Sequence, residues 1–224
     1  MLTLGHVLTA LTGQPHQNST TPVLADAVVD SQLASPGALF IALPGERTDG
    51  HNFVESAIEQ GASVALVQQP IADLPTLDLR QPGPYVLPDL SHPVCIQVAD
   101  TLQALQQLAR YWRRQLSDLT VVGITGSVGK TTTKELVAAV LQAQFRTLKT
   151  VGNLNNEIGL PLTVLRLTSA HQIAVLEMGF YQLGEIDFLC DIAQPQIGVV
   201  NNVYPVHLER AGSLENIQQG KGEL

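Results

Sequence analysis

The chain has 224 residues, enough for one or two domains with a buried core; 45% of them are hydrophobic and 14% charged. Its formal net charge of −8 argues against a general nucleic-acid-binding protein, which normally carries a basic patch. Two cysteines far apart in sequence, Cys95 and Cys190, argue against a disulfide framework and a zinc motif. No apolar run approaches the roughly 20 residues that cross a bilayer, and the N-terminus lacks the basic start of a signal peptide, so a cytoplasmic protein is predicted.

The first 98 residues predict a small α/β domain. Residues 70–93 within it are rich in proline and are expected to be irregular, because proline cannot donate a hydrogen bond to a sheet. Hydrophobic patterning and turn residues predict helices over 2–11 and 53–60 and strands over 27–31, 38–43, 63–67 and 94–98.

Residues 99–224 predict a second domain in which strands and helices alternate. A helix over 99–115 leads into it, and core packing is expected for its apolar face, Leu102, Leu105, Leu108, Ala109 and Trp112. Strands are predicted over 119–124, 147–151, 172–178 and 197–200, and helices over 131–144, 160–165 and 185–192. Such alternation is typical of a parallel sheet with helices on both faces, whose ligands bind at the carboxyl ends of the strands.

The most informative segment is VVGITGSVGKTTT, residues 121–133, where an apolar strand ends in a glycine-rich turn followed by Lys-Thr and a helix. In a phosphate-binding loop, backbone N–H groups point at phosphate oxygens, the lysine reaches the terminal phosphates and the hydroxyl binds Mg²⁺. These roles fall to Lys130 and Thr131. The strict pattern needs a glycine where this chain has Ile124, so the loop is a variant. Its strand and helix context favours phosphate binding over a chance Gly-Lys-Thr.

Glu177 follows an apolar run at the end of a predicted buried strand. A carboxylate there is costly unless it is paired or metal-bound, and beside a phosphate loop its natural partner is Mg²⁺; the alternative is a solvated strand end. By residue type alone, turn-forming, surface or core positions account for five other polar residues: Asn153, Asn155, Asn156, His207 and Lys221.

Several segments together resemble the Mur ligase family of peptidoglycan synthesis. In the second domain these are TGSVGKTTTKE (125–135), which accounts for the shifted glycine, GNLNNEIGLPLTVLRL (152–167), AVLEMG (174–179) with GEI (184–186), and HLERAGSLENI (207–217) with KGEL (221–224). In the first domain, GALFIALPGERTDGHNFVESAIEQGA (37–62) resembles the family's UDP-substrate domain. The form of 152–167 favours the branch of the family that adds a D-alanyl-D-alanine dipeptide.

The resemblance implies a fold and a reaction. The fold is α/β: a small N-terminal UDP-substrate-binding domain, 1–98, then a P-loop central domain, 99–224, with a mainly parallel sheet. The reaction is ATP-dependent amide-bond formation with Mg²⁺. The γ-phosphate moves to the carboxylate of UDP-MurNAc-tripeptide, and the amine of D-Ala-D-Ala attacks the acyl phosphate. The resemblance also implies small-molecule substrates, no nucleic acid, no membrane insertion and a monomer when full length.

The same resemblance assigns roles to individual residues. The implied catalytic residues are Lys130, Glu177, His207 and Lys221. The implied metal ligands are Thr131, Glu177, His207 and Lys221, the last as an anionic carbamate. ATP is expected to contact Thr125, Gly126, Ser127, Val128, Gly129, Lys130, Thr131 and Asn156. The UDP-substrate is expected to contact Asp30, Ser31, Asp49, Gly50 and His51.

The chain departs from the family pattern in places. Gln32 replaces an arginine near the expected uridine site, Tyr204 replaces a glycine after the last predicted strand, and Gly220 replaces a common alanine. Val128 stands where asparagine is frequent, at a variable position. The largest departure is length. The central domain is expected to be incomplete and the third domain absent, which predicts an inactive fragment with an exposed sheet edge.

Two alternatives stay open at this point. Tripeptide synthetases of the same family and folylpolyglutamate synthases share the loop, so the substrate could differ. A non-catalytic UDP-sugar or nucleotide-binding module is a different class, and Gln32, Tyr204 and the missing C-terminal parts favour it. Phosphate release with the candidate substrates separates the three.

Overall fold

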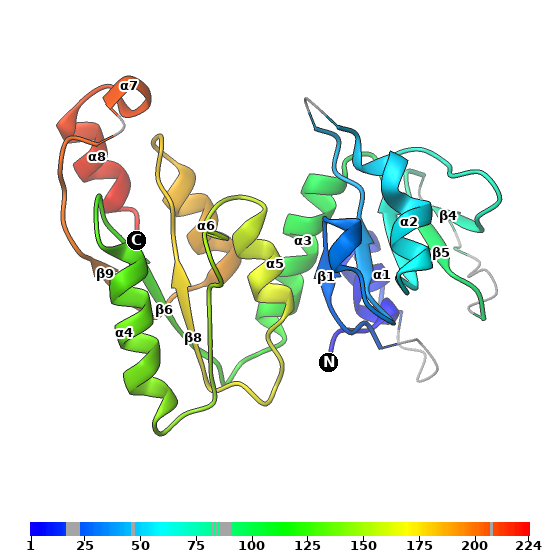
Figure 1. Cartoon of the computed structure of the whole chain (residues 1–224), viewed down its shortest axis with the longest axis horizontal. Helices are drawn as coiled ribbons and strands as arrows, with labels where there is room; N and C mark the ends of the chain where they lie inside the picture. Colours follow the sequence, from blue (N-terminus) through cyan, green and yellow to red (C-terminus); the bar gives the residue numbers. More distant parts are fainter. Residues whose placement is uncertain (17–22, 46–47, 82, 84, 86–90, 207) are drawn as a thin grey trace. The chain divides into compact units, whose positions relative to one another are not determined.

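The computed structural model describes residues 1–16, 23–45, 48–81, 83, 85, 91–206 and 208–224 (Figure 1). The chain forms two compact units, Met1–Trp112 and Arg113–Leu224, each built on a parallel sheet, which confirms the predicted α/β class. The change of unit falls inside helix α3 (Thr101–Arg114). A domain division between residues 98 and 99 stays a prediction. No helix of the described chain is both long and apolar enough to cross a membrane.

The first unit contains a five-stranded parallel sheet of order β1-β2-β3-β5-β4. Its strands are β1 (Ala27–Val28), β2 (Leu39–Ile41), β3 (Val64–Val67), β4 (Thr76–Asp78) and β5 (Val94–Gln97). Strand β4 corrects the expectation that residues 70–93 are irregular throughout. Pro75 precedes the strand, and its carbonyl accepts the Cys95 N–H at 2.8 Å. Three residues free of proline therefore suffice for an edge strand.

The helices of the first unit agree with the patterning, and two 3₁₀ turns join them. The elements are α1 (Leu4–Thr12), η1 (Ser31–Leu33), η2 (Gly50–Phe53), α2 (Val54–Glu59) and most of α3. On α3, Leu105, Leu108, Ala109 and Trp112 are buried, as predicted, while Leu102 is only half-buried. The buried Thr101 hydroxyl donates to the Ala42 carbonyl at 2.8 Å and so ties the start of α3 to the chain just after β2.

The second unit contains a four-stranded parallel sheet of order β7-β8-β6-β9. Its strands are β6 (Thr120–Thr125), β7 (Thr147–Lys149), β8 (Ile173–Glu177) and β9 (Ile197–Val200), and its helices are α4 (Lys130–Gln142), α5 (Gly159–Leu165), α6 (Glu185–Ala193), α7 (Leu208–Ala211) and α8 (Leu214–Lys221). The register aligns Ile124 with Glu177 and Thr125 with Val200. The carboxyl ends of β6, β8 and β9 therefore meet at one edge, which positions the site.

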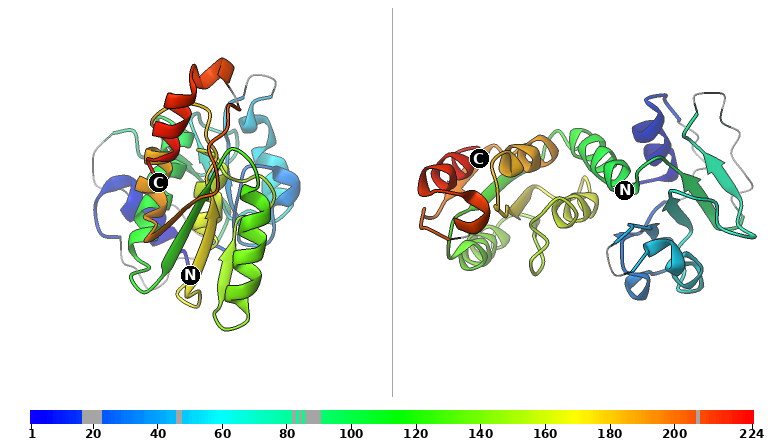
Figure 2. Two further views of the ribbon diagram at one scale, coloured as in Figure 1. Left: turned by 90° about the vertical axis from the view of Figure 1, so that its left-hand side faces the viewer. Right: turned by 90° about the horizontal axis from the view of Figure 1, so that it is seen from above.

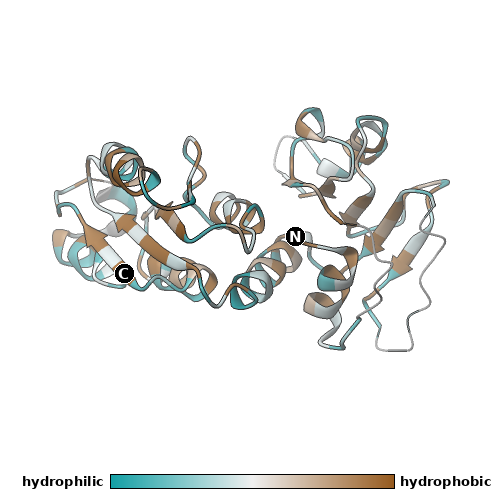
Figure 3. Ribbon diagram, turned by 90° about the horizontal axis from the view of Figure 1, so that it is seen from below, coloured by the Kyte–Doolittle hydropathy of each residue, from teal (hydrophilic) through white to brown (hydrophobic). Residues whose placement is uncertain are grey.

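Apolar strands lie between helical layers in the second unit. Helix α4 lies on one face of the sheet, and α6 with α8 lies on the other (Figure 2). All five residues of β8 are buried, and the strands show as predominantly hydrophobic in Figure 3. Strand β9 ends the order, and its Ile197 and Val200 are exposed. Continuous apolar runs thus serve as central strands, as parallel sheets require.

Candidate active site

The predicted phosphate loop joins β6 to α4. Gly126 and Gly129 have φ values of 153° and 84°, where only glycine is comfortable, and a Cβ on Gly126 would lie 2.8 Å from the Asn201 Cβ. Helix α4 begins at Lys130, so its first N–H groups and the positive end of its dipole face the loop. The Lys130 Nζ donates to the Gly126 carbonyl at 2.9 Å. The sequence therefore forms a turn suited to binding an anion.

Glu177 lies against the start of α4 and is only 3% exposed. Its Oε2 accepts the Thr131 hydroxyl at 2.9 Å, and its Oε1 accepts the Asn155 side-chain N–H at 2.8 Å. The Lys134 Nζ lies 4.0 Å from Oε2. The structure thus brings together Thr131 and Glu177, the expected metal ligands of the loop, and adds Asn155 and Lys134, which the sequence reasoning did not assign to the site.

The segment after β9 holds the phosphate loop by hydrogen bonds. The Asn202 side chain accepts from the Val128 N–H and donates to the Val128 carbonyl, both at 3.0 Å. Ser127 donates its N–H to the Asn202 carbonyl at 3.1 Å, and its hydroxyl bonds both the N–H and the carbonyl of Tyr204. Tyr204 therefore has an exposed ring and a bonded backbone. Two loop residues are fixed before any ligand arrives.

Replacing Asn202 with aspartate should weaken nucleotide binding about tenfold, the effect of losing about one net hydrogen bond. Aspartate can still accept from the Val128 N–H but cannot donate to the Val128 carbonyl, and it adds a negative charge beside the phosphates. Calorimetric titration with ATP measures the effect. The same change at the exposed Asn153 is the control. Equal affinities for both variants would show that the two-point contact does not shape the loop.

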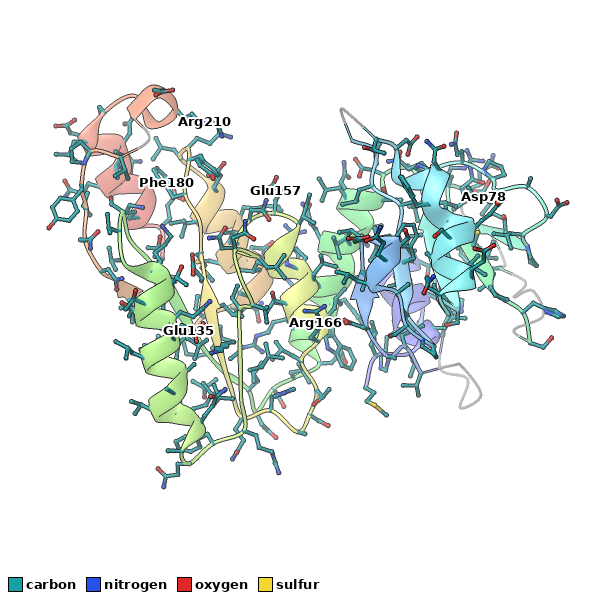
Figure 4. The ribbon with its side chains drawn as sticks, viewed as in Figure 1. Asp78, Glu135, Glu157, Arg166, Phe180 and Arg210 are labelled. Carbon is teal, nitrogen blue, oxygen red and sulfur yellow. The ribbon has the colours of Figure 1, made fainter. Side chains whose placement is uncertain are left out.

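Lys221 is buried at the end of α8, whereas the polar composition of the surrounding segment indicates a solvated position. Its Nζ lies 4.8 Å from the centre of the Phe180 ring, which follows β8 and is labelled in Figure 4. Burial, and then the charge of Lys130, lower the pKa of the Lys221 ammonium to about 8. Gly220 allows this packing, because a Cβ there would lie 1.9 Å from the Phe180 ring. His207, the other expected ligand beside Lys221, lies outside the described residues.

The other residues expected to bind ATP surround the loop in different ways. The buried Thr125 hydroxyl donates to the Met178 carbonyl at 3.0 Å. Asn156 accepts the N–H groups of Ile158 and Gly159 through its Oδ1 and so caps the start of α5. Its neighbour Asn155 contacts Glu177 instead. The described residues contain no group of three or more His, Cys, Asp or Glu side chains arranged to hold a metal.

The expected substrate residues of the first unit stabilise two 3₁₀ turns. Asp30 caps η1 by accepting the Gln32 N–H at 2.9 Å, beside the buried Ser31. Asp49 caps η2, accepting from the backbone N–H of His51 at 3.0 Å and from its Nδ1 at 2.6 Å.

Gly50 and His51, which follow Asp49, lie close to backbone groups of other segments. The buried His51 accepts the Gln68 N–H at Nε2, at 2.8 Å, so Nδ1 carries the proton. A Cβ on Gly50 would lie 2.7 Å from the Leu43 backbone. Both ring nitrogens of His51 are therefore used within the fold, and its contribution to any substrate site is to shape the η2 turn.

Two family models match this chain. The Mur ligase family, catalytic domain, matches residues 28–113, and the Mur ligase middle domain matches residues 124–224. The chain therefore belongs to the Mur ligase family.

Relatives of one activity match both units. The UDP-N-acetylmuramoyl-tripeptide–D-alanyl-D-alanine ligase of Bacillus subtilis is 43% identical over 202 residues, and that of Escherichia coli is 41% identical over 204 residues; each match covers 90% of this chain and 41% of the relative. MurF from Acinetobacter baumannii superposes with a TM-score of 0.78 at 36% identity, over 98% of this chain and 45% of that one. MurF ligase from Thermotoga maritima, in complex with ADP, gives 0.72 at 34% identity, over 96% and 43%. The chain thus spans less than half the length of these relatives.

The residues present fit a magnesium nucleotide. The Thr131 hydroxyl and the Glu177 carboxylate are hard oxygen ligands of the kind Mg²⁺ prefers, and they lie 2.9 Å apart where α4 begins. The glycines leave the loop backbone open to phosphate oxygens, and Lys130 lies within the same loop. The shape and chemistry of the site agree with the family to which the chain belongs.

Proposed function

We propose that this chain takes part in the ATP-dependent ligation of D-Ala-D-Ala to UDP-MurNAc-tripeptide in peptidoglycan synthesis. The observation that carries the proposal is the phosphate loop with Lys130 at its end and Thr131 bonded to the buried Glu177. The relatives match both units of the chain at about 40% identity, so the substrates in their names support the proposed substrates. The proposal extends to ATP and Mg²⁺ as cofactors, a cytoplasmic location and a monomeric state when full length.

The geometry supports a proposed role for each of these residues. The amides of the loop and the Lys130 ammonium stabilise negative charge on the phosphoryl group that moves to the substrate carboxylate. Thr131 and Glu177 would hold Mg²⁺, which neutralises phosphate charge when bound. The buried position of Glu177 and its fixed hydrogen bonds keep its carboxylate oriented toward the loop. We place UDP-substrate binding in the first unit, at the turns capped by Asp30 and Asp49.

The test measures phosphate release by the intact open reading frame that contains this chain, with ATP, Mg²⁺, UDP-MurNAc-tripeptide and D-Ala-D-Ala, followed by mass spectrometry of the product. Release that requires both substrates, with formation of the pentapeptide product, supports the proposal. Binding of ATP without release under these conditions would instead indicate a non-catalytic nucleotide-binding module. Release with a UDP-MurNAc-dipeptide and a diamino acid, giving the tripeptide, would indicate a tripeptide synthetase.

We expect Lys221 to form a carbamate more readily than an ordinary lysine, because only the neutral amine attacks carbon dioxide. With a pKa of about 8, about a tenth of the Lys221 amine is neutral at pH 7, far more than for a lysine of ordinary pKa. The neutral fraction rises as the pH passes through 8, so the carbamate signal should grow between pH 6.5 and 8.5 at constant dissolved carbon dioxide, those limits being an approximate window around the pKa.

¹³C NMR of protein equilibrated with labelled bicarbonate measures this signal. The substitution Lys221→Arg should remove it, whereas the same change at the half-exposed Lys149 should leave it in place. A signal that survives Lys221→Arg, or that does not change with pH, would contradict the expectation.

A further inference from the structure

Lys134 is a buried lysine that the proposed mechanism does not use. It is 1% exposed and lies on α4, three residues after Thr131, so both side chains face the same side of the helix. Lysine is almost never fully buried without a partner, because removing an ammonium from water costs several kcal/mol. An interaction inside the unit must therefore offset the burial of Lys134.

The surroundings of Lys134 form a row of alternating charges. Its Nζ lies 3.2 Å from the Glu135 Oε1 and 4.0 Å from the Glu177 Oε2. The other Glu135 oxygen pairs with Lys149 of β7. Glu135, labelled on α4 in Figure 4, and Lys149 are partly exposed, whereas Lys134 and Glu177 are almost fully buried. The row therefore runs from the surface to the carboxylate at the phosphate loop, and its charges sum to zero.

The two buried members depend on each other. The described hydrogen bonds to the Glu177 carboxylate come from the neutral side chains Thr131 and Asn155. Among the described residues, Lys134 is the cation that pairs with the Glu177 carboxylate. At 4.0 Å the ammonium attracts the carboxylate without a normal hydrogen bond, so it does not fill an oxygen lone pair. The closer contact with Glu135 holds it at that distance.

We propose that Lys134 is a positioning residue that serves as the internal counter-ion of Glu177. It holds the buried carboxylate in place, while Glu135 holds the ammonium back so that the carboxylate oxygens stay available to a cation. The inference rests on the proposed function in one respect, that Glu177 receives a metal at the phosphate loop.

A double-mutant cycle in nucleotide-free protein tests the pair, with thermal unfolding as the readout. Lys134→Met keeps the apolar stem but leaves Glu177 an unpaired buried anion, and should lower the Tm by roughly 10 °C. The double variant Lys134→Met with Glu177→Gln should return to within roughly 3 °C of Glu177→Gln alone, because the buried negative charge is gone. The matched cycle of Arg114→Met with Glu177→Gln should be additive, because Arg114 is exposed and its ion pair with Asp191 lies outside the row.

The outcomes divide cleanly. If Lys134→Met does not fold but the double variant does, the coupling is present in its extreme form and supports the proposal. If the losses in Tm caused by Lys134→Met and by Glu177→Gln simply add, Lys134 is not the counter-ion and the proposal is overturned. The proposal is likewise overturned if neither Lys134→Met nor the double variant folds. A packing role alone would not be relieved by a change at Glu177.

A second readout connects the pair to the metal. Mg·ADP should raise the Tm of Lys134→Met by more than it raises that of the wild type, because the cation then supplies the missing positive charge. An equal or smaller rise would overturn the proposal. A wild type that gains no stability from Mg·ADP would contradict the proposed function itself, while the nucleotide-free cycle would still report whether the ion pair exists.

Discussion

Replacing Lys130 with alanine in the intact open reading frame should lower the rate of substrate-dependent phosphate release by roughly 10³-fold, the effect of losing a fixed charge at a transferring phosphoryl group. The ammonium lies at the end of the loop, where its hydrogen bond to the Gly126 carbonyl shows that it reaches back over the turn. That bond is worth about 1 kcal/mol, so the variant should fold normally. The loss should therefore appear in activity and not in the Tm.

Single-turnover measurement of acyl-phosphate formation locates the loss in the phosphoryl-transfer step. The control is Lys149→Ala, which removes a half-exposed lysine of the same unit and should change the rate less than about twofold. Lys130→Arg should recover only part of the rate, since a planar guanidinium does not replace a compact ammonium. A Lys130→Ala variant with undiminished activity would contradict the proposed ligase mechanism.

The patterned parts of the fold and of the loop were predictable because they depend on residues near in sequence. The strand 119–124 and helix 131–144 of the prediction correspond to β6 and α4, and the turn between them needs glycine at positions that the sequence displays. Glu177 was found for a similar reason. An acidic residue that ends an apolar run at a strand tip is unusual in itself.

Residues whose role depends on distant contacts could not be found in this way. Asn155 and Asn156 are adjacent and identical in type, yet one contacts Glu177 and the other caps α5. The apolar residues Leu136 and Val140 would mark the buried face of α4 by hydrophobic periodicity, but both are exposed. The charged Lys134 is buried instead, which periodicity does not predict. Asn202 bonds a loop more than 70 residues earlier. The roles of Asn155, Lys134 and Asn202 become visible only in the fold, because the fold determines which strand ends are neighbours.

Arg113 should be a residue whose loss strongly weakens the second unit, although it lies outside the candidate active site. Arg113 is 4% exposed, and its guanidinium donates to four carbonyls: Ala193 at 2.8 Å, Leu116 at 3.0 Å, and Leu119 and Gln194 at 3.3 Å. Burial lowers the pKa of this guanidinium from its usual range, yet arginine stays charged. One side chain thus satisfies carbonyls before β6 and at the end of α6.

The end of α6 explains why these bonds matter. Gln194 ends the helix with a φ of 49°, a left-handed conformation that costs about 1 kcal/mol for a residue with a side chain. The last carbonyls of a helix have no partner within it, so Arg113 supplies donors where α6 turns toward β9. Without the guanidinium, the carbonyl of the buried Ala193 would lose this donor while the strained turn remained.

We therefore expect Arg113→Met to lower the free energy of unfolding of the second unit by about 3 kcal/mol, because the apolar stem is retained but the buried carbonyls lose their donors. Urea denaturation followed by circular dichroism measures the change. The matched control is Arg114→Met, since Arg114 is exposed and lies 3.8 Å from Asp191, an ion pair worth less than about 1 kcal/mol. Equal stability losses for the two variants would mean that the carbonyl contacts of Arg113 do not hold the end of α6. A loss confined to Arg113→Met would show that a residue remote from the phosphate loop maintains the turn that leads from α6 into β9.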